Sequence, residues 1–260
     1  MSAILLEQDI VHYEVLGRGR PLVFLHGWVG SWRYWIPVMQ AASISFRAYA
    51  IDLWGFGDSA KKQSRYSLDQ QIYLVDGFLD SLGIGRVALV GHGLGAMIAL
   101  QYALLHPDTV DRVMAVSYPL EENMINSRLR NGPPADLADW LLGRTPLTEP
   151  VRADALKADH QAVQASLNNL GGVQNTFQEM STACVLVNGQ NDPVIEQPRL
   201  EQIASLPEFT HAVIFDQSGH FPMLDESNKF NRLMADFLAL PSGESPRQLS
   251  LKEEWKRRVR

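Results

Sequence analysis

The chain has 260 residues, of which 46% are hydrophobic and 20% are charged, and its formal net charge is −6. This composition is typical of a globular protein and excludes a disordered or collagen-like chain. A chain with this negative charge has no overall basic field that would hold nucleic acid or an anionic membrane surface. The single cysteine, Cys184, excludes an intramolecular disulfide and a cysteine-based zinc site.

The first predicted elements are two short strands. Residues 10–15 alternate roughly between apolar and polar side chains, and residues 21–25 form an apolar run. Residues 17–19 read Gly-Arg-Gly, which is a turn signal between the two strands. The pattern predicts a β-hairpin that leads into the core.

After residue 46, apolar strands alternate with helices. The predicted strands are 47–51, 86–90, 113–117, 184–188 and 212–215, and the predicted helices are 68–82, 94–105 and 228–240. A continuous apolar run such as 86–90 is typical of a strand that is covered on both faces. Strand–helix alternation of this kind predicts an α/β fold with a mostly parallel sheet and helices on both sides.

One long segment interrupts this alternation. Residues 120–181 are polar, contain several Gly and Pro residues, and show helical periodicity at 135–142 and 150–170. We interpret this segment as a helical cap inserted into a core made of residues 1–119 and 182–240. A separate small domain is the alternative, but so polar a segment would bury little core of its own.

The last 20 residues differ in charge from the rest of the chain. Residues 241–260 carry six Lys or Arg and three Asp or Glu, and so form a basic tail. We expect a solvated terminus, and a short basic helix at 249–260 is the alternative.

The segment most relevant to function is residues 90–96, Val-Gly-His-Gly-Leu-Gly-Ala, which joins a predicted strand to a predicted helix. It does not match the dinucleotide-binding pattern Gly-x-Gly-x-x-Gly, whose turn follows the first strand of its domain. It resembles the nucleophile elbow of the α/β-hydrolase family, Gly-x-Ser-x-Gly. Gly91, His92 and Gly95 match that pattern, and Gly93 stands where the family has its nucleophilic serine. The resemblance implies an eight-stranded, mostly parallel sheet.

The resemblance also assigns the other members of a catalytic triad. Asp192 follows the predicted strand 184–188 at the family's acid position, and His220 follows the last predicted strand at the position of the catalytic histidine. In such a triad the acid orients the imidazole, and the imidazole faces the space above the elbow.

The segment His26-Gly27-Trp28 resembles the family's oxyanion loop. The resemblance implies that the backbone N–H groups of Trp28 and Leu94 stabilise a developing oxyanion. Those amides and the imidazole of His220 should converge on an empty space above Gly93. The residues expected to line the pocket are His26, Gly27, His92 and Ser117.

The glycine at position 93 leaves three interpretations open. The first is an ester or carbon–carbon bond hydrolase whose serine has been replaced, in which Gly93→Ser would restore an acyl-enzyme. The second is chemistry without a serine, in which Asp192 and His220 activate water or abstract a proton. The third is a ligand-binding or sensor protein that keeps the pocket without turnover.

Partners and location follow from composition and motifs. The cap segment has no cluster of Arg or Lys, so a small, largely apolar carbonyl compound is the expected ligand. No cofactor or metal is expected, and a homo-oligomer is possible. Residues 87–105 are interrupted by His92 and Gln101 and fall short of a membrane span. Residues 1–10 do not read as a secretory signal, so we expect a cytoplasmic protein.

Overall fold

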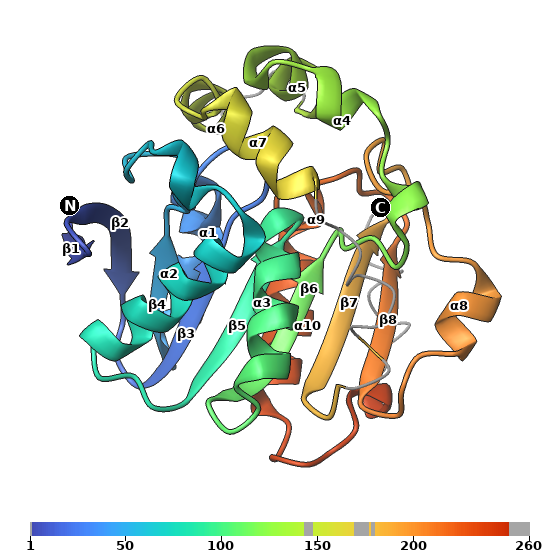
Figure 1. Ribbon diagram of the computed structural model, residues 1–260. Helices are drawn as coiled ribbons and strands as arrows, with labels where there is room; N and C mark the ends of the chain where they lie inside the picture. Colours follow the sequence, from blue (N-terminus) through green and yellow to red (C-terminus); the bar gives the residue numbers. More distant parts are fainter. Residues whose placement is uncertain (1, 143–147, 169–176, 178–179, 250–260) are drawn as a thin grey trace.

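The computed structural model describes residues 2–142, 148–168, 177 and 180–249, and its strands form one eight-stranded sheet (Figure 1). The strand order is β1-β2-β4-β3-β5-β6-β7-β8. The pairs from β4 to β8 are parallel, and β1 and β2 add an antiparallel edge. The strands are β1 (Ser2–Leu6), β2 (Asp9–Leu16), β3 (Arg20–Leu25), β4 (Phe46–Ile51), β5 (Val87–His92), β6 (Val110–Val116), β7 (Ala183–Gly189) and β8 (Thr210–Phe215). The predicted fold class is therefore confirmed.

Helices cover both faces of this sheet. α2 packs with α3 against one face, and α1 packs with α10 on the other. The helices outside the segment 120–181 are α1 (Ile36–Ala42), α2 (Leu68–Ser81), α3 (Leu94–Leu105), α8 (Leu200–Ala204), α9 (Pro222–Asp225) and α10 (Ser227–Ala239). The three predicted helices correspond to α2, α3 and α10, and the bounds of α3 agree with the prediction at both ends.

The predicted hairpin of the first two strands is wrong. β2 pairs with β1 and β4, whereas β3 lies on the other side of β4 and pairs with β4 and β5. Most of β3 is fully buried, so it needs a neighbour on each side, as a central parallel strand has. The turn at 17–19 therefore carries the chain past the start of β4 and does not join two paired strands.

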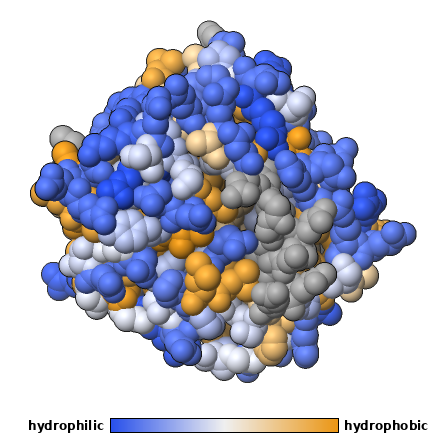
Figure 2. All heavy atoms as spheres, viewed as in Figure 1, coloured by the Kyte–Doolittle hydropathy of each residue, from blue (hydrophilic) through white to orange (hydrophobic). Residues whose placement is uncertain are grey.

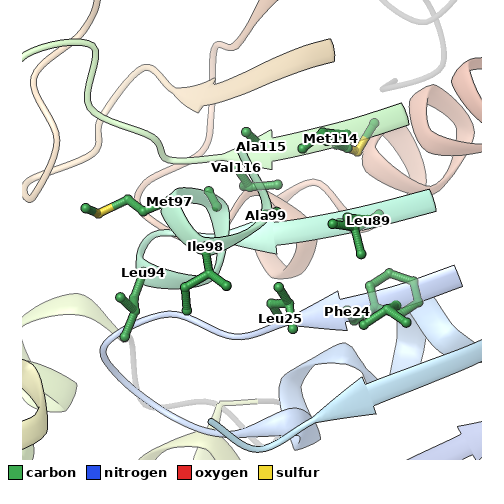
Figure 3. Packing of buried hydrophobic residues seen from close by; sticks show 14 of the residues in the cluster. Phe24, Leu25, Leu89, Leu94, Met97, Ile98, Ala99, Met114, Ala115 and Val116 are labelled. Carbon is green, nitrogen blue, oxygen red and sulfur yellow. The ribbon is translucent and has the colours of Figure 1, made fainter. Parts of the chain in front are cut away.

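The helix that follows β5 is buried almost all round. Nine of its residues are buried, and its apolar side chains fill the space between the central strands and α2. Figure 3 shows Leu94 and Ile98 projecting from α3 toward β3, where Leu25 lies. This packing places the start of α3 above the carboxyl ends of the central strands, the usual edge for ligands in open α/β sheets.

The described part of the segment 120–181 contains four short α-helices, which lie above that edge of the sheet (Figure 1). They are α4 (Arg128–Asn131), α5 (Pro134–Leu141), α6 (Glu149–Ala155) and α7 (His160–Leu167). The predicted piece 150–170 is thus two helices, and its last two residues lie outside the described part. The part of the basic tail beyond residue 249 lies outside it too.

Among the residues coloured in Figure 2, this face of the molecule is mostly hydrophilic, with hydrophobic residues in small groups.

Within the described residues, no helix is both long and apolar enough to span a membrane.

The close approach of α3 to β3 predicts that Gly95→Ala is destabilising. A Cβ at Gly95 would overlap the backbone carbonyls of Leu25 and His26, because α3 crosses β3 there with no room for a side chain. We expect a loss of about 1–3 kcal/mol in the free energy of unfolding, measured by urea denaturation. Gly85→Ala is the control, since a Cβ at Gly85 meets nothing within 4 Å. Equal effects of the two substitutions would contradict this account of the crossing.

Candidate active site

The turn between β5 and α3 has the backbone geometry of an elbow. Gly93 has φ 51° and ψ −111°, in the left-handed half of conformational space, and the carbonyl of Gly93 accepts the first helical hydrogen bonds of α3. The N–H of Gly93 donates to Val116 O at 2.9 Å, and that of Gly95 donates to His26 O at 3.0 Å. An L side chain at this φ is strained, whereas glycine adopts it freely. The turn is therefore held in the elbow shape without a nucleophile.

The space above Gly93 is filled by the indole of Trp28. A Cβ at Gly93 would lie 2.8 Å from Cζ3 and 2.9 Å from Cε3 of that ring, closer than side chains tolerate. Trp28 is fully buried. The sequence-based expectation of an empty space is thus wrong, because the segment 26–28, which resembles the family's oxyanion loop, places its largest side chain over the glycine.

The indole is fixed by a hydrogen bond to a helix of the 120–181 segment. Trp28 Nε1 donates to Ser166 Oγ at 3.0 Å, and Ser166 Oγ donates to Val163 O at 2.7 Å within α7. Ser166 is itself buried. Trp28 therefore links the elbow to α7. Ser166 was not singled out from the sequence, since no motif marks it.

Asp192 and His220 meet at the carboxyl ends of β7 and β8. Nδ1 of His220 lies 2.9 Å from Oδ2 and 3.1 Å from Oδ1 of Asp192, and both side chains are buried. The N–H groups of Val194 and Ile195 donate to Asp192 Oδ1 at 2.8 and 3.1 Å. The ring of His220 lies 4.6 Å, centroid to centroid, from that of His92, which precedes Gly93. The structure therefore brings the predicted acid and base together beside the elbow.

The electrostatics of this pair favour an ionised Asp192. Burial works against the charge of the carboxylate, but the nearby His220 and the hydrogen bonds from His220, Val194 and Ile195 outweigh it, so the pKa of Asp192 lies below its ordinary value. An ionised Asp192 keeps the Nδ1 proton of His220 in place and leaves Nε2 as the basic nitrogen.

The two predicted oxyanion donors are the N–H groups of Trp28, at the end of the segment 26–28, and of Leu94, at the start of α3. In the described part of the chain, neither Trp28 N–H nor Leu94 N–H has a backbone carbonyl partner. Leu94 is the first residue of α3, where N–H groups are unpaired within the helix and the helix dipole favours negative charge.

A buried hydrogen-bond chain joins the oxyanion loop to the backbone of His220. The N–H of Gly27 donates to Tyr34 Oη at 2.5 Å, and Tyr34 Oη lies 2.9 Å from His92 Nδ1. His92 Nε2 lies 2.8 Å from the carbonyl of His220, which can only accept. His92 Nε2 therefore carries the proton, and Tyr34 donates to Nδ1. Burial, with His220 nearby, lowers the pKa of His92 well below its ordinary value, and burial raises that of Tyr34, so both groups are neutral.

Ser117 supports the same carbonyl from the end of β6. Its Oγ donates to His220 O at 3.0 Å, and its backbone has φ 50°, which is strained for serine. Ser117 and His92 are fully buried and bond within the protein. Both hold the backbone that carries His220.

His26 plays a similar part in the oxyanion loop. The N–H of Leu53 donates to His26 Nε2 at 3.0 Å, so Nδ1 carries the proton and donates to Gly27 O at 2.8 Å. Burial lowers the pKa of His26, in keeping with a neutral ring. Gly27 is thus fixed at both backbone groups, by His26 and by Tyr34. No motif in the sequence marks Tyr34, whose role depends on contacts with Gly27 and His92.

One side-chain group could offer ligand atoms to a metal ion. Atoms of His12, Asp52 and Asp58 lie within 4.8 Å of one another. His12 Nδ1 and Asp52 Oδ2 are only 2.8 Å apart, however, and the N–H groups of Trp32 and Asp58 donate to the same carboxylate. These contacts are the hydrogen bonds of a structural His–Asp pair, which holds the loop after β4.

The contact between Trp28 and Gly93 predicts coupled substitutions. Gly93→Ala alone should destabilise the protein through both strain and overlap with the indole, whereas Trp28→Leu removes the overlapping ring atoms. In urea denaturation we expect the double variant to lose about 1–3 kcal/mol less than the sum of the two single losses. Gly93→Ala paired with Trp54→Leu, in the loop after β4, should be additive. Additivity in the Trp28 pair would mean that the indole does not pack on the glycine.

The lowered pKa of Asp192 predicts a pH-dependent contribution to stability. The ionised carboxylate stabilises the folded state above the ordinary Asp pKa of about 3.9, and this contribution is lost as the pH falls through the lowered pKa. Asp192→Asn should therefore cost about 1.5–3 kcal/mol at neutral pH and progressively less in acid, measured by urea denaturation across pH. Asp136→Asn, an exposed change, should cost little at any pH. If the cost of Asp192→Asn instead increased in acid, the ionised carboxylate would not be the form that stabilises the folded state.

Comparison with known proteins places this geometry in a family. The family described as "alpha/beta hydrolase fold" matches residues 20–183. The protein named "Putative carbamate hydrolase RutD" from Yersinia enterocolitica is 27% identical over 94% of this chain and 97% of its own length. The 2-hydroxymuconate semialdehyde hydrolase of Pseudomonas sp. CF600 is 26% identical over 86% and 88%. The crystal structure of the enol-lactonase from Burkholderia xenovorans superposes with a TM-score of 0.77 at 19% identity over 92% of this chain and 100% of that one. The family match, the shared fold and the elbow show that this chain belongs to the α/β-hydrolase fold family.

Proposed function

We propose that this protein hydrolyses a small, largely apolar carbonyl compound, such as an ester or carbamate, without a covalent intermediate on residue 93. In this mechanism His220 removes a proton from water through Nε2, and Asp192 orients the imidazole. The N–H groups of Trp28 and Leu94 donate to the oxyanion of the tetrahedral intermediate. The water oxygen adds to the carbonyl carbon to form this intermediate. The bond from that carbon to the leaving group then breaks, and His220 returns the proton to the leaving group.

The observation that carries this proposal is the position of Trp28. Its ring takes the volume above Gly93 in which a serine side chain would stand, so an attacking oxygen cannot come from the elbow. The base and its orienting acid are nevertheless complete, with Asp192 buried and held by two backbone donors. A water molecule is the nucleophile that this set of groups can activate.

The family relatives support the reaction class. Two of those named above are a carbamate hydrolase and a semialdehyde hydrolase by name, and carbamates and semialdehydes are carbonyl compounds. Attack of water on a carbonyl carbon gives a tetrahedral intermediate that carries an oxyanion, and a His–Asp pair can activate that water. In this proposal the substrate is a carbonyl compound, as the names of the relatives suggest, and water takes the place of the elbow serine as the nucleophile.

The helices α4–α7 act in this proposal as the cap over the site. Asp154 of α6 accepts from Ser31 Oγ and pairs with Arg33 Nε at 2.9 Å, which ties α6 to the segment after the oxyanion loop. Asp159, at the start of α7, accepts from Tyr66 at 2.7 Å. These buried or half-buried links hold the cap close to the core and keep bulk water from the reacting groups.

The test is turnover of p-nitrophenyl acetate and a series of aryl carbamates. His220→Ala should lower kcat about 10²–10⁴-fold, because the general base is lost. Asp192→Asn should lower it as well, because the imidazole loses its orienting acceptor. His106→Ala, a half-exposed histidine at the end of α3, is the matched control and should be unchanged. Full activity in His220→Ala would refute the mechanism.

The nucleophile is tested separately by pre-steady-state kinetics. We expect no burst of p-nitrophenol from the unsubstituted chain, and none from Gly93→Ser, because the new side chain would meet the Trp28 ring. A stoichiometric burst from Gly93→Ser would favour the interpretation that a serine enzyme has lost its nucleophile.

A second candidate is a ligand-binding protein of the same fold. The packing of Trp28 on Gly93 favours it too, because the ring takes up part of the reacting volume. This candidate predicts saturable binding of the esters with no product. Product that increases in proportion to protein concentration, and that disappears in His220→Ala, excludes it.

A further inference from the structure

A cavity of about 470 Å³ lies at the amino ends of the central strands, at the edge of the sheet opposite Asp192 and His220. Arg20 begins β3, Val87 begins β5 and Arg112 lies near the start of β6, and all three line this cavity. Its size is within the range of ~300–1,000 Å³ that is usual for small-molecule sites. The volume is therefore sufficient for a compound of modest size.

Three guanidinium groups surround this cavity, with one carboxylate between two of them. Asp111 pairs through Oδ1 with Arg86 Nη2 at 2.7 Å and through Oδ2 with Arg112 Nε at 2.6 Å. One carboxylate neutralises one of those two guanidinium groups. The cavity wall consequently keeps a positive charge even before Arg20 is considered.

Arg20 has no carboxylate partner among the described residues. Its guanidinium lies 5.2 Å from the ring centre of Phe46, and Nη2 donates to Leu238 O at a long 3.4 Å. A long bond to a neutral carbonyl is weaker than a charge-assisted bond to an anion. An anionic ligand would therefore be the better acceptor for Arg20.

Arg112 is held rigidly at the inner wall. Its side chain is only 4% exposed, its Nη1 donates to Phe237 O at 2.6 Å, and its guanidinium lies over the ring of Phe237. A guanidinium fixed in this way loses little conformational freedom on binding. The remaining wall is largely apolar, with Phe46, Val87 and Leu240 among its members.

We propose that this cavity binds a small anionic amphiphile, in which a carboxylate or phosphate group contacts the arginines and an alkyl or aryl body lies on the apolar wall. The guanidinium fork matches both head groups, so they share one recognition chemistry. The site is independent of the hydrolytic proposal, because it lies at the other edge of the sheet.

Isothermal titration calorimetry of the full chain tests the proposal with four probes: octanoate, octyl phosphate, octanol and inorganic phosphate. We expect both anionic amphiphiles to bind saturably, each at least about tenfold more tightly than octanol or inorganic phosphate. The relative affinity of octanoate and octyl phosphate identifies the preferred head group. Octanol binding as tightly as octanoate would overturn the proposal, as would the absence of saturable binding by both amphiphiles.

Variants locate the site. Arg20→Gln and Arg86→Gln are exposed changes that should preserve folding, checked by thermal unfolding, and each should weaken binding of the preferred amphiphile about tenfold. Arg18→Gln, in the exposed turn at 17–19, is the matched control and should not change the affinity. His220→Ala should not change it either. Loss of binding in His220→Ala, with full binding in both cavity variants, would place the anion at the other edge and refute the site.

Discussion

The Trp28 ring occupies the position that a Cβ at residue 93 would take, and this is the constraint on which the rest of the site depends. It favours glycine at the elbow, because a Cβ there would lie within 2.9 Å of two indole atoms and would force the ring or the turn to shift. It also requires a fixed oxyanion loop and a fixed α7, because the indole is bonded to Ser166. The absence of a nucleophilic side chain and the presence of a large aromatic side chain are thus one structural feature. A substitution at Trp28 therefore changes the effect of a substitution at Gly93 on stability, and the reverse also holds.

The histidines near the elbow divide into two groups with different physical roles. His26 and His92 are buried and neutral, and every ring nitrogen contacts a protein partner. They act on backbone atoms of the oxyanion loop and of residue 220. His220 instead has the Asp192 carboxylate on Nδ1, which leaves Nε2 as the nitrogen that can accept a proton in the proposed reaction. Titratable groups of the same kind therefore have separate tasks because their neighbours differ.

The two edges of the sheet differ in chemistry. The carboxyl ends of the strands carry the His–Asp pair, the amides of Trp28 and Leu94, and the described helices of the 120–181 segment. The amino ends carry a cavity with arginines and an apolar wall. Parallel strands create this polarity, since every strand end of one kind lies at one edge. A single core can therefore support two sites without mixing their residues.

The sequence by itself determined the α/β class, the strand–helix alternation, the bounds of α3 and the positions of Gly93, Asp192 and His220 relative to their strands. These features depend on local periodicity and on short motifs, which involve only residues that are close together in the sequence. Only the tertiary structure decided that β3 lies beyond β4, that Trp28 covers Gly93, and that Tyr34 and His92 connect the loop to residue 220. Each of these depends on contacts between segments far apart in the chain. The most distant, His92 with His220 and Trp28 with Ser166, join residues 128 and 138 positions apart, for which local patterns contain no signal.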